Sequence, residues 1–376
     1  MSPLTPRPEN LTDRDLERLA EAQRVKGVSL GLDAWRRLRK NKIAMLALGF
    51  LGLLTLLAVF TPLLPFQPPR RVQTKLKYAP PDPIWQGVFH PTSQLLDEHG
   101  QWDEAAANDG FGDRDLDPFS HFLLRTRARI FGPWEFASLC GRDELGHDLL
   151  SRLLWGARLS LAVAFVATFV SLIIGVTYGA VSGYLGGWVD NLMMRVVDIL
   201  YSVPFIYVVL FLISILSQPT WKARLAYYGI TRITIFFFVI GAIYWLTMAR
   251  VVRGQIMSLK NEQFIEAART IGASKSRIIF RHLVPNVLSV VIVYLTLTIP
   301  KVMLFEAFLS FLGLGVEAPD VSWGLLANAG VKVITPIQVY WWLVVFPGLA
   351  LGLTLLSLNF LGDGLRDALD PRLKNK

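Results

Sequence analysis

Residues 159–181 read LSLAVAFVATFVSLIIGVTYGAV and contain no charged side chain. The hydrocarbon core of a bilayer is about 30 Å thick, so a helix needs about 20 apolar residues to cross it. Only a helix or a closed barrel leaves no unpaired backbone amide in lipid. The composition of the whole chain is also typical of a membrane protein, because 53% of its 376 residues are hydrophobic and only 18% are charged. The sequence therefore predicts an all-α integral membrane protein.

Six segments meet or approach the length of a transmembrane helix. Three are uncharged and long enough to span. Two are shorter, one of them with Pro204 inside it, and another carries Lys301 and Glu306 in its second half. Those two charges require protein or water around them, not lipid. In chain order, the segments are 43–64, 159–181, 199–216, 233–248, 284 to about 313, and 339–362.

Basic residues beside these segments predict the orientation. Arginines and lysines stand directly before the first segment and throughout the loop between the fourth and fifth, and such residues favour the cytoplasmic side. Six spans then return both termini to the cytoplasm. We expect a cytoplasmic segment over 1–42, a first transmembrane helix over 43–65, an extracytoplasmic region over 66–150, and a five-helix core with a cytoplasmic tail over 151–376.

The expected extracytoplasmic region is rich in proline, tryptophan and acidic residues and shows no clear long helix. Two interpretations remain open. The region is either a solvated, partly ordered loop or a docking surface for an extracytoplasmic partner.

The sequence offers no site for catalysis or for a metal. A single cysteine, Cys140, excludes a disulfide framework within the chain, and no two histidines form a helical pair with a glutamate between them. Residues 272–276 look like the tail of a phosphate-binding loop, but the lysine follows serine and no buried strand precedes it. The net charge is +9, and the basic residues behind it lie beside the membrane segments. Nucleic acid is therefore not an expected partner.

Four glycines recur every fourth residue along the second segment, at Gly175, Gly179, Gly183 and Gly187. Such a stripe lets another helix approach closely, while the last pair is expected to belong to the exit turn. The approaching helix comes either from this chain or from a second subunit.

Residues 261–285 read NEQFIEAARTIGASKSRIIFRHLVP and predict two helices joined by a turn. Four residues at helical spacing form one apolar face of the first helix, namely Phe264, Ala267, Ala268 and Ile271. Gly272 suits the left-handed position after the helix, and Ser274 can cap the next one. Small side chains on this face would let another protein approach closely, and an arginine of that protein could bind Glu266.

The tripeptide Glu266-Ala267-Ala268 is followed by Gly272 and, after a gap, by Pro285. This pattern resembles the EAA loop of permease subunits in binding-protein-dependent ABC importers, with the loop over about 249–283. Further stretches resemble the C-type subunit of dipeptide and oligopeptide permeases over about 141–373 and, more loosely, 35–65. They are GRDELGHD at 141–148, VSGYLGG at 181–187, VRGQ at 252–255, FEAFLSFLGLG at 305–315 and LGDGLRDALDP at 361–371.

The resemblance implies six transmembrane helices of the type I ABC importer permease kind in the bacterial cytoplasmic (inner) membrane. A sister permease would complete the pore, and an extracytoplasmic solute-binding protein would deliver di- or oligopeptides. Two cytosolic ATPase subunits would bind ATP and magnesium, so this chain would be no enzyme and would hold no cofactor itself. Glu266, Ala267 and Ala268 would contact an ATPase. Gly272 would set the angle to the next helix, and Pro285 belongs to the same coupling motif.

Other solutes would suit the same kind of subunit, such as a nickel complex, glutathione or a peptide-like antibiotic. An ion-coupled secondary transporter is the competing class, but it would require ion sites near the bilayer midplane, and most spans here are uncharged. Lys301 and Glu306 lie about 140° apart around a helix, which disfavours a direct ion pair. They are candidates for the translocation path, or they pair with other helices and cap a turn.

Overall fold

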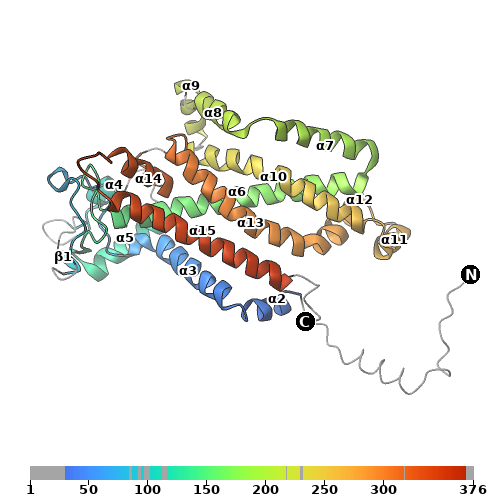
Figure 1. Ribbon diagram of the computed structural model, residues 1–376, viewed down its shortest axis with the longest axis horizontal. Helices are drawn as coiled ribbons and strands as arrows, with labels where there is room; N and C mark the ends of the chain where they lie inside the picture. Colours follow the sequence, from blue (N-terminus) through green and yellow to red (C-terminus); the bar gives the residue numbers. More distant parts are fainter. Residues whose placement is uncertain are drawn as a thin grey trace, which may run out of the picture.

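The protein is an elongated helical bundle in the computed structural model, which describes residues 30–83, 87–91, 95–96, 102–111, 117–216, 218–228, 232–316 and 318–369 (Figure 1). Most of the expected N-terminal segment and the tail beyond residue 369 lie outside the described residues. The helices are α2 (Leu30–Leu38), α3 (Lys42–Val59), α4 (Glu104–Phe111), α5 (Pro118–Phe131), α6 (Leu149–Leu185), α7 (Gly187–Ser202), α8 (Phe205–Leu216), α9 (Pro219–Tyr227), α10 (Arg232–Leu259), α11 (Gln263–Thr270), α12 (Lys275–Arg277), α13 (Val284–Phe311), α14 (Trp323–Lys332) and α15 (Trp342–Leu369).

Among the described residues, five helices are long and apolar enough to cross a membrane, and α7 with α8 supplies a sixth crossing if the pair counts as one span. Helices α3, α6, α10, α13 and α15 confirm five of the six expected segments. The expected continuous helix over 199–216 is wrong, because α7 and α8 meet at an angle of 80°. Pro204 lies at the break, where it lacks an amide donor and disfavours a helical conformation in Val203.

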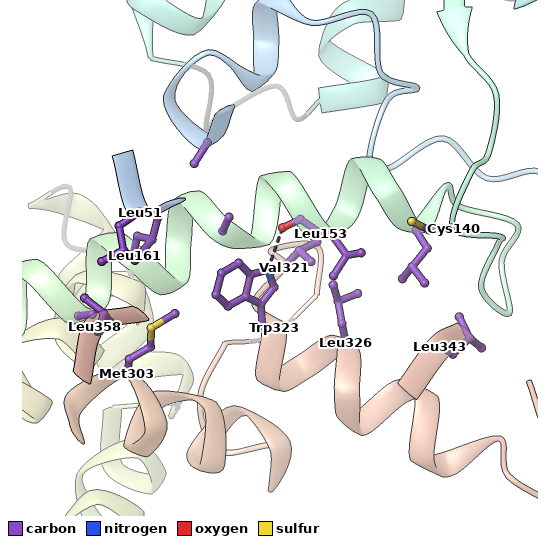
Figure 2. Packing of buried hydrophobic residues seen from close by; sticks show 14 of the residues in the cluster. Leu51, Cys140, Leu153, Leu161, Met303, Val321, Trp323, Leu326, Leu343 and Leu358 are labelled. Carbon is purple, nitrogen blue, oxygen red and sulfur yellow. Dashed lines mark hydrogen bonds between the residues drawn. The ribbon is translucent and has the colours of Figure 1, made fainter. Parts of the chain in front are cut away.

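Helix α6 lies at the centre of the bundle. It packs on α10 along its length and also contacts α13, α3 and α14. Figure 2 shows the apolar core where α6, α14 and α15 meet, with Trp323 fully buried between them. The indole Nε1–H of Trp323 donates a hydrogen bond to the carbonyl of Leu153 at 2.9 Å. The polar edge of this large core residue is therefore satisfied, as burial requires.

The two ends of the bundle differ. Helix α2, the last residues of α15 and the short helix α11 lie at one end, and α4, α5 and strand β1 (Phe89–Pro91) lie at the other (Figure 1). Ala34 and Leu38 of α2 pack against Ala44 and Ala368, so the two described ends of the chain meet on the side of α11. This arrangement agrees with an even number of crossings between them.

The described residues between 66 and 148 contain more secondary structure than the sequence predicts. The expectation of no long helix is wrong, because α5 has 14 residues and packs with α4 around Leu95 and Phe111. Strand β1 pairs antiparallel with β2 (Trp134–Phe136). Glu135 of β2 is fully buried between Arg127 and Arg71, each 3.2 Å from one of its oxygens. These contacts link residues far apart in the chain, and local sequence patterns do not show them.

The stretch 141–148 forms a tight loop that leads into α6. Asp148 is the N-cap of α6 and accepts hydrogen bonds from the Ser151 amide at 2.8 Å and the Ser138 hydroxyl at 2.7 Å. Asp143 accepts from the amides of Leu145 and His147, both at 2.9 Å, and contacts the His147 ring. Burial would raise the pKa of Asp143, but hydrogen bonds from His147 and the charge of Arg152 lower that pKa to about 2. Asp143 therefore stays ionised and holds the loop together.

Candidate functional site

Helix α11 lies beyond the ends of α10 and α13, at the tip of the bundle (Figure 1). It ends in the way the sequence predicts. Gly272 has φ +80°, its amide donates to the carbonyl of Arg269, and the amide of Ala273 donates to the carbonyl of Ala268, each at 3.0 Å. This pair of bonds is a Schellman motif. Ser274 then caps α12 by accepting from the Arg277 amide at 3.4 Å, so both expected caps are confirmed.

The exposed and buried faces of α11 differ from the expected ones. Ile265 and Ala268 point inward, and Ala268 is only 4% exposed in a cluster that includes Ile256 of α10. The side chain of Ile271 is 83% exposed, and Phe264 is also exposed. The sequence placed Phe264, Ala267, Ala268 and Ile271 on one contact face, but the structure divides them between two. Ala268 therefore anchors α11 to its own chain and does not form an outer contact surface.

The remaining residues of the expected coupling motif are exposed. Glu266 and Ala267 lie on the outer side of α11, and Gly272 lies at its end. Pro285 is exposed as well, in the first turn of α13, and is separated from α11 by α12 and a π-helical segment, Ile278–Leu283. The structure thus brings Glu266, Ala267 and Gly272 together on one tip, while Pro285 belongs to the connection into the bundle.

Polar contacts join α11 to the bundle, and the sequence analysis did not identify them. The guanidinium of Arg269 donates to the carbonyl of Lys260 at 3.2 Å and lies over the ring of Tyr184, 5.6 Å from its centroid. The ammonium of Lys260 donates to the carbonyl of Gly183 at 3.2 Å. Helix α11 is therefore held at the junction of α6 and α10, and a displacement of α11 acts on both helices.

Two ion pairs connect α10 to α7. Arg253 donates to both carboxylate oxygens of Asp190 at 2.6 Å, while the hydroxyl of Ser182 also donates to Asp190. One helical turn earlier, Arg250 donates to Asp198 at 2.7 Å. Asp190 is buried, so its charge requires such partners. A carboxylate at the start of an apolar stretch was the sequence signal that could have indicated this connection.

The glycine stripe of α6 packs against α10 of the same chain. A Cβ atom on Gly175 would lie 2.6 Å from the Met248 side chain, and one on Gly183 would lie 2.8 Å from the Arg253 carbonyl. This supports contact within the chain over contact with a second subunit. Gly183 is helical and does not belong to the exit turn, contrary to the expectation, whereas Gly187 has φ +58° and opens α7.

The two charges of α13 lie on different faces. Glu306 is fully buried and accepts hydrogen bonds from Ser310 at 2.7 Å and Ser160 at 3.2 Å. Its assignment as a candidate for the translocation path is therefore corrected, because it binds α6 and α13 together and has no exposed surface. Lys301 is exposed, and its carbonyl accepts from the Tyr244 hydroxyl at 3.2 Å.

Residues 175–375 match the family described as the inner membrane component of binding-protein-dependent transport systems, and residues 29–81 match the N-terminal transmembrane domain of oligopeptide transport permease C. The dipeptide transport system permease protein DppC of Bacillus subtilis is 37% identical over 95% of this chain and 91% of that protein. The oligopeptide transport system permease protein OppC of Escherichia coli (strain K12) is 38% identical over 95% of this chain and 96% of that protein.

A chain of the solved MetNI methionine ABC transporter, in an inward-facing conformation, aligns with 59% of this chain and 96% of its own length, at 19% identity and a TM-score of 0.45. The family match covers more than half of this chain, and the two permease relatives cover nearly all of it. The chain therefore belongs to the inner membrane components of binding-protein-dependent transport systems.

Proposed function

We propose that this chain is a permease subunit of an ABC importer for peptides. The relatives named above include both a dipeptide and an oligopeptide permease, at 37% and 38% identity over 95% of the chain, which supports peptides as a class. A sister permease completes the translocation path, and an extracytoplasmic solute-binding protein delivers the substrate. Both termini and α11 face the cytoplasm, where two ATPase subunits bind ATP and magnesium.

The observation that carries this proposal is the exposed tip of α11. Glu266, Phe264 and Ile271 are all exposed on this short tip, and Ile271 is 83% exposed. Exposed aliphatic and aromatic side chains at the end of a bundle are typical of a protein contact. We assign this surface to a groove on an ATPase subunit, with Glu266 bound by a basic side chain and Ala267 allowing close approach.

The mechanism follows from how α11 is attached. Ile265 and Ala268 pack into the bundle, and Arg269 and Lys260 tie the tip to α6 and α10. When ATP binding closes the ATPase pair, the tip moves as one body with the adjacent ends of α10 and α13. The ion pair between Arg253 and Asp190 passes this movement to α7. Tilting of these helices alternates access to the path, as in other rigid-body transitions.

Cross-linking tests the assignment of the tip. In the assembled transporter, Ile271→Cys is treated with a thiol-to-amine cross-linker and compared with Leu312→Cys, which is exposed at the opposite end of α13. We expect Ile271→Cys to capture an ATPase subunit and Leu312→Cys not to. A membrane-impermeant maleimide should label Ile271→Cys only from the cytoplasmic side. Capture at Leu312 alone, or labelling of Ile271 from outside, contradicts the proposal.

Uptake by proteoliposomes tests the substrate. With the solute-binding protein outside and ATP inside, we expect labelled peptides to accumulate, and a nickel complex, glutathione or a peptide-like antibiotic to accumulate less. Uptake without ATP, driven by an ion gradient, contradicts an ABC importer and indicates a secondary transporter. Uptake of one of the other solutes in preference to peptides contradicts the peptide assignment but leaves the subunit type in place.

A further inference from the structure

Helix α5 carries an apolar face that the described part of the chain leaves exposed. Phe119, Phe122 and Ile130 are 46%, 65% and 64% exposed. At about 100° per residue they lie within one narrow sector of the helix. The opposite sector, with Leu124 and Ala128, is buried in the core of the outer region. Side chains of this size, exposed in a row, indicate a surface that binds something apolar.

The position of α5 indicates which apolar partner this face contacts. Helix α3 has 18 residues and so is about 27 Å long, close to the thickness of the hydrocarbon core. Phe60 follows its last residue and therefore lies near the membrane boundary on the side opposite α11. The ring of Phe119 packs edge-on against Phe60, with the ring centroids 6.4 Å apart. The first turn of α5 is thus at the membrane boundary.

The apolar face of α5 continues an apolar surface of α3. Leu53, Leu56 and Val59 of α3 are exposed on a charge-free span, on which no described helix packs over these side chains. Phe60 and Phe119 join this surface to Phe122. The apolar faces of the two helices therefore meet at Phe60 and Phe119, and the α3 part lies within the hydrocarbon thickness.

The charges beside this face fit a membrane surface. Arg129 and Arg125 lie along one edge of the apolar sector of α5, and residues 118–131 contain no acidic side chain. Arg129 has no ion pair among the described residues, whereas Arg125 lies 3.7 Å from Glu104 of α4 in an exposed pair that leaves part of its guanidinium open. The third arginine of the helix, Arg127, turns away from the surface and pairs with buried Glu135. An apolar sector edged by arginines is typical of helices that lie in the interface of a bilayer, with the guanidinium groups at lipid phosphates.

We propose that α5 lies on the bilayer surface opposite α11, with Phe119, Phe122 and Ile130 among the acyl chains and Arg125 and Arg129 at the headgroups. The helix would fix the height of the outer region above the membrane. The inference depends only on α3 crossing the membrane, and it holds for either orientation of the chain and for any solute.

Spin-label accessibility tests the proposal on the chain with its co-purifying subunits, in nanodiscs of phosphatidylethanolamine and phosphatidylglycerol. Labels are placed singly in a Cys140→Ala background. Phe122→Cys is compared with three reference positions: Leu53→Cys on the span, exposed Asp109→Cys on α4, and buried Ala128→Cys on α5 itself. Collisions with oxygen, which concentrates in lipid, are measured against collisions with a water-soluble nickel chelate.

We expect Phe122 to match Leu53, with frequent oxygen and rare nickel collisions, and Phe119 and Ile130 to follow it while Ala128 is low for both. A Phe122 label that matches Asp109, with frequent nickel collisions, shows a water-exposed face and overturns the proposal. A label low for both reagents shows that another protein covers the face, and that result overturns it too. Arg125→Cys, at the edge of the sector, should give an intermediate ratio.

Discussion

Replacing Gly179 with alanine tests whether the close approach of α6 and α10 holds this bundle together. A Cβ atom on Gly179 would lie 3.0 Å from the backbone nitrogen of Arg253 and nearer still to the carbonyl oxygen of Ala249. Both neighbours are backbone atoms, so no side chain can rotate to relieve the contact. Helix α10 must move away by roughly 1 Å, which removes a quarter to a half of the dispersion energy of each affected contact.

The size of the destabilisation follows from a comparison of Gly179→Ala with Gly52→Ala. Alanine in place of a helical glycine stabilises by about 1 kcal/mol, while overpacking costs about 1–3 kcal/mol. Gly52 of α3 is exposed, with nothing within 4 Å of an added Cβ atom. Gly52→Ala should therefore show only the stabilisation that comes from the higher helix propensity of alanine. We expect Gly179→Ala to lower the free energy of unfolding by about 1–3 kcal/mol relative to Gly52→Ala.

Thermal unfolding of the purified transporter in detergent, followed by tryptophan fluorescence, measures the difference. The midpoint should fall for Gly179→Ala and rise slightly for Gly52→Ala. Peptide uptake should also fall for Gly179→Ala, since α10 connects directly to α11. An equal rise of the midpoint in both variants would refute the reasoning, because it would show that α6 and α10 are not in close contact at this point.

Four further outcomes are expected. Gly272→Pro should abolish uptake at normal protein levels, because proline cannot adopt φ +80° and removes the amide bonded to Arg269; wild-type uptake would contradict the coupling assignment. Truncating either Asp190 or Arg253 to alanine should destabilise by about 3 kcal/mol, and the double variant by less than the sum; additive unfolding midpoints would exclude the ion pair. Burial raises the pKa of Asp148 to about 6, so the stabilisation from its protonated form is complete below about pH 4 and is lost as the pH rises through 6. It amounts to about 3 kcal/mol at most. Asp148→Asn keeps a capping oxygen and should remove the fall of the unfolding midpoint between about pH 4 and 6, while an unchanged pH profile would contradict the raised pKa. Lys301→Met should reduce peptide uptake more than it reduces assembly of the subunits. A loss of assembly alone would show that Lys301 has a structural role and does not belong to the translocation path.

Several features of the fold follow from short stretches of sequence. Long apolar runs predicted five of the spans, because a backbone in lipid must bond to itself whatever lies beside it. The end of α11 at Gly272 and the cap at Ser274 were also predictable, since each depends on a single residue and its nearest neighbours. Membership of the permease family followed in the same way, from the order of several short motifs.

Other features depended on which helices meet. Nothing in residues 261–285 alone shows that Ala268 packs toward Ile256 while Ile271 is exposed, because both are apolar and lie on adjacent faces of one helix. The bend between α7 and α8 depends on Pro204 and on separate neighbours, because α7 contacts α6 while α8 contacts α10. The position of Glu306 in the sequence is compatible with the translocation path, but the hydroxyls of Ser160 and Ser310 bind its carboxylate inside the bundle.

The sequence by itself determined that this protein is a membrane permease with a helical tip between its fourth and fifth spans, because lipid and helix caps act within one segment at a time. The tertiary structure alone decided which side of that tip is exposed, that α10 fills the glycine stripe, and that the outer region folds around α5. Those outcomes depend on contacts between segments far apart in the chain, and periodicity within a segment does not specify them.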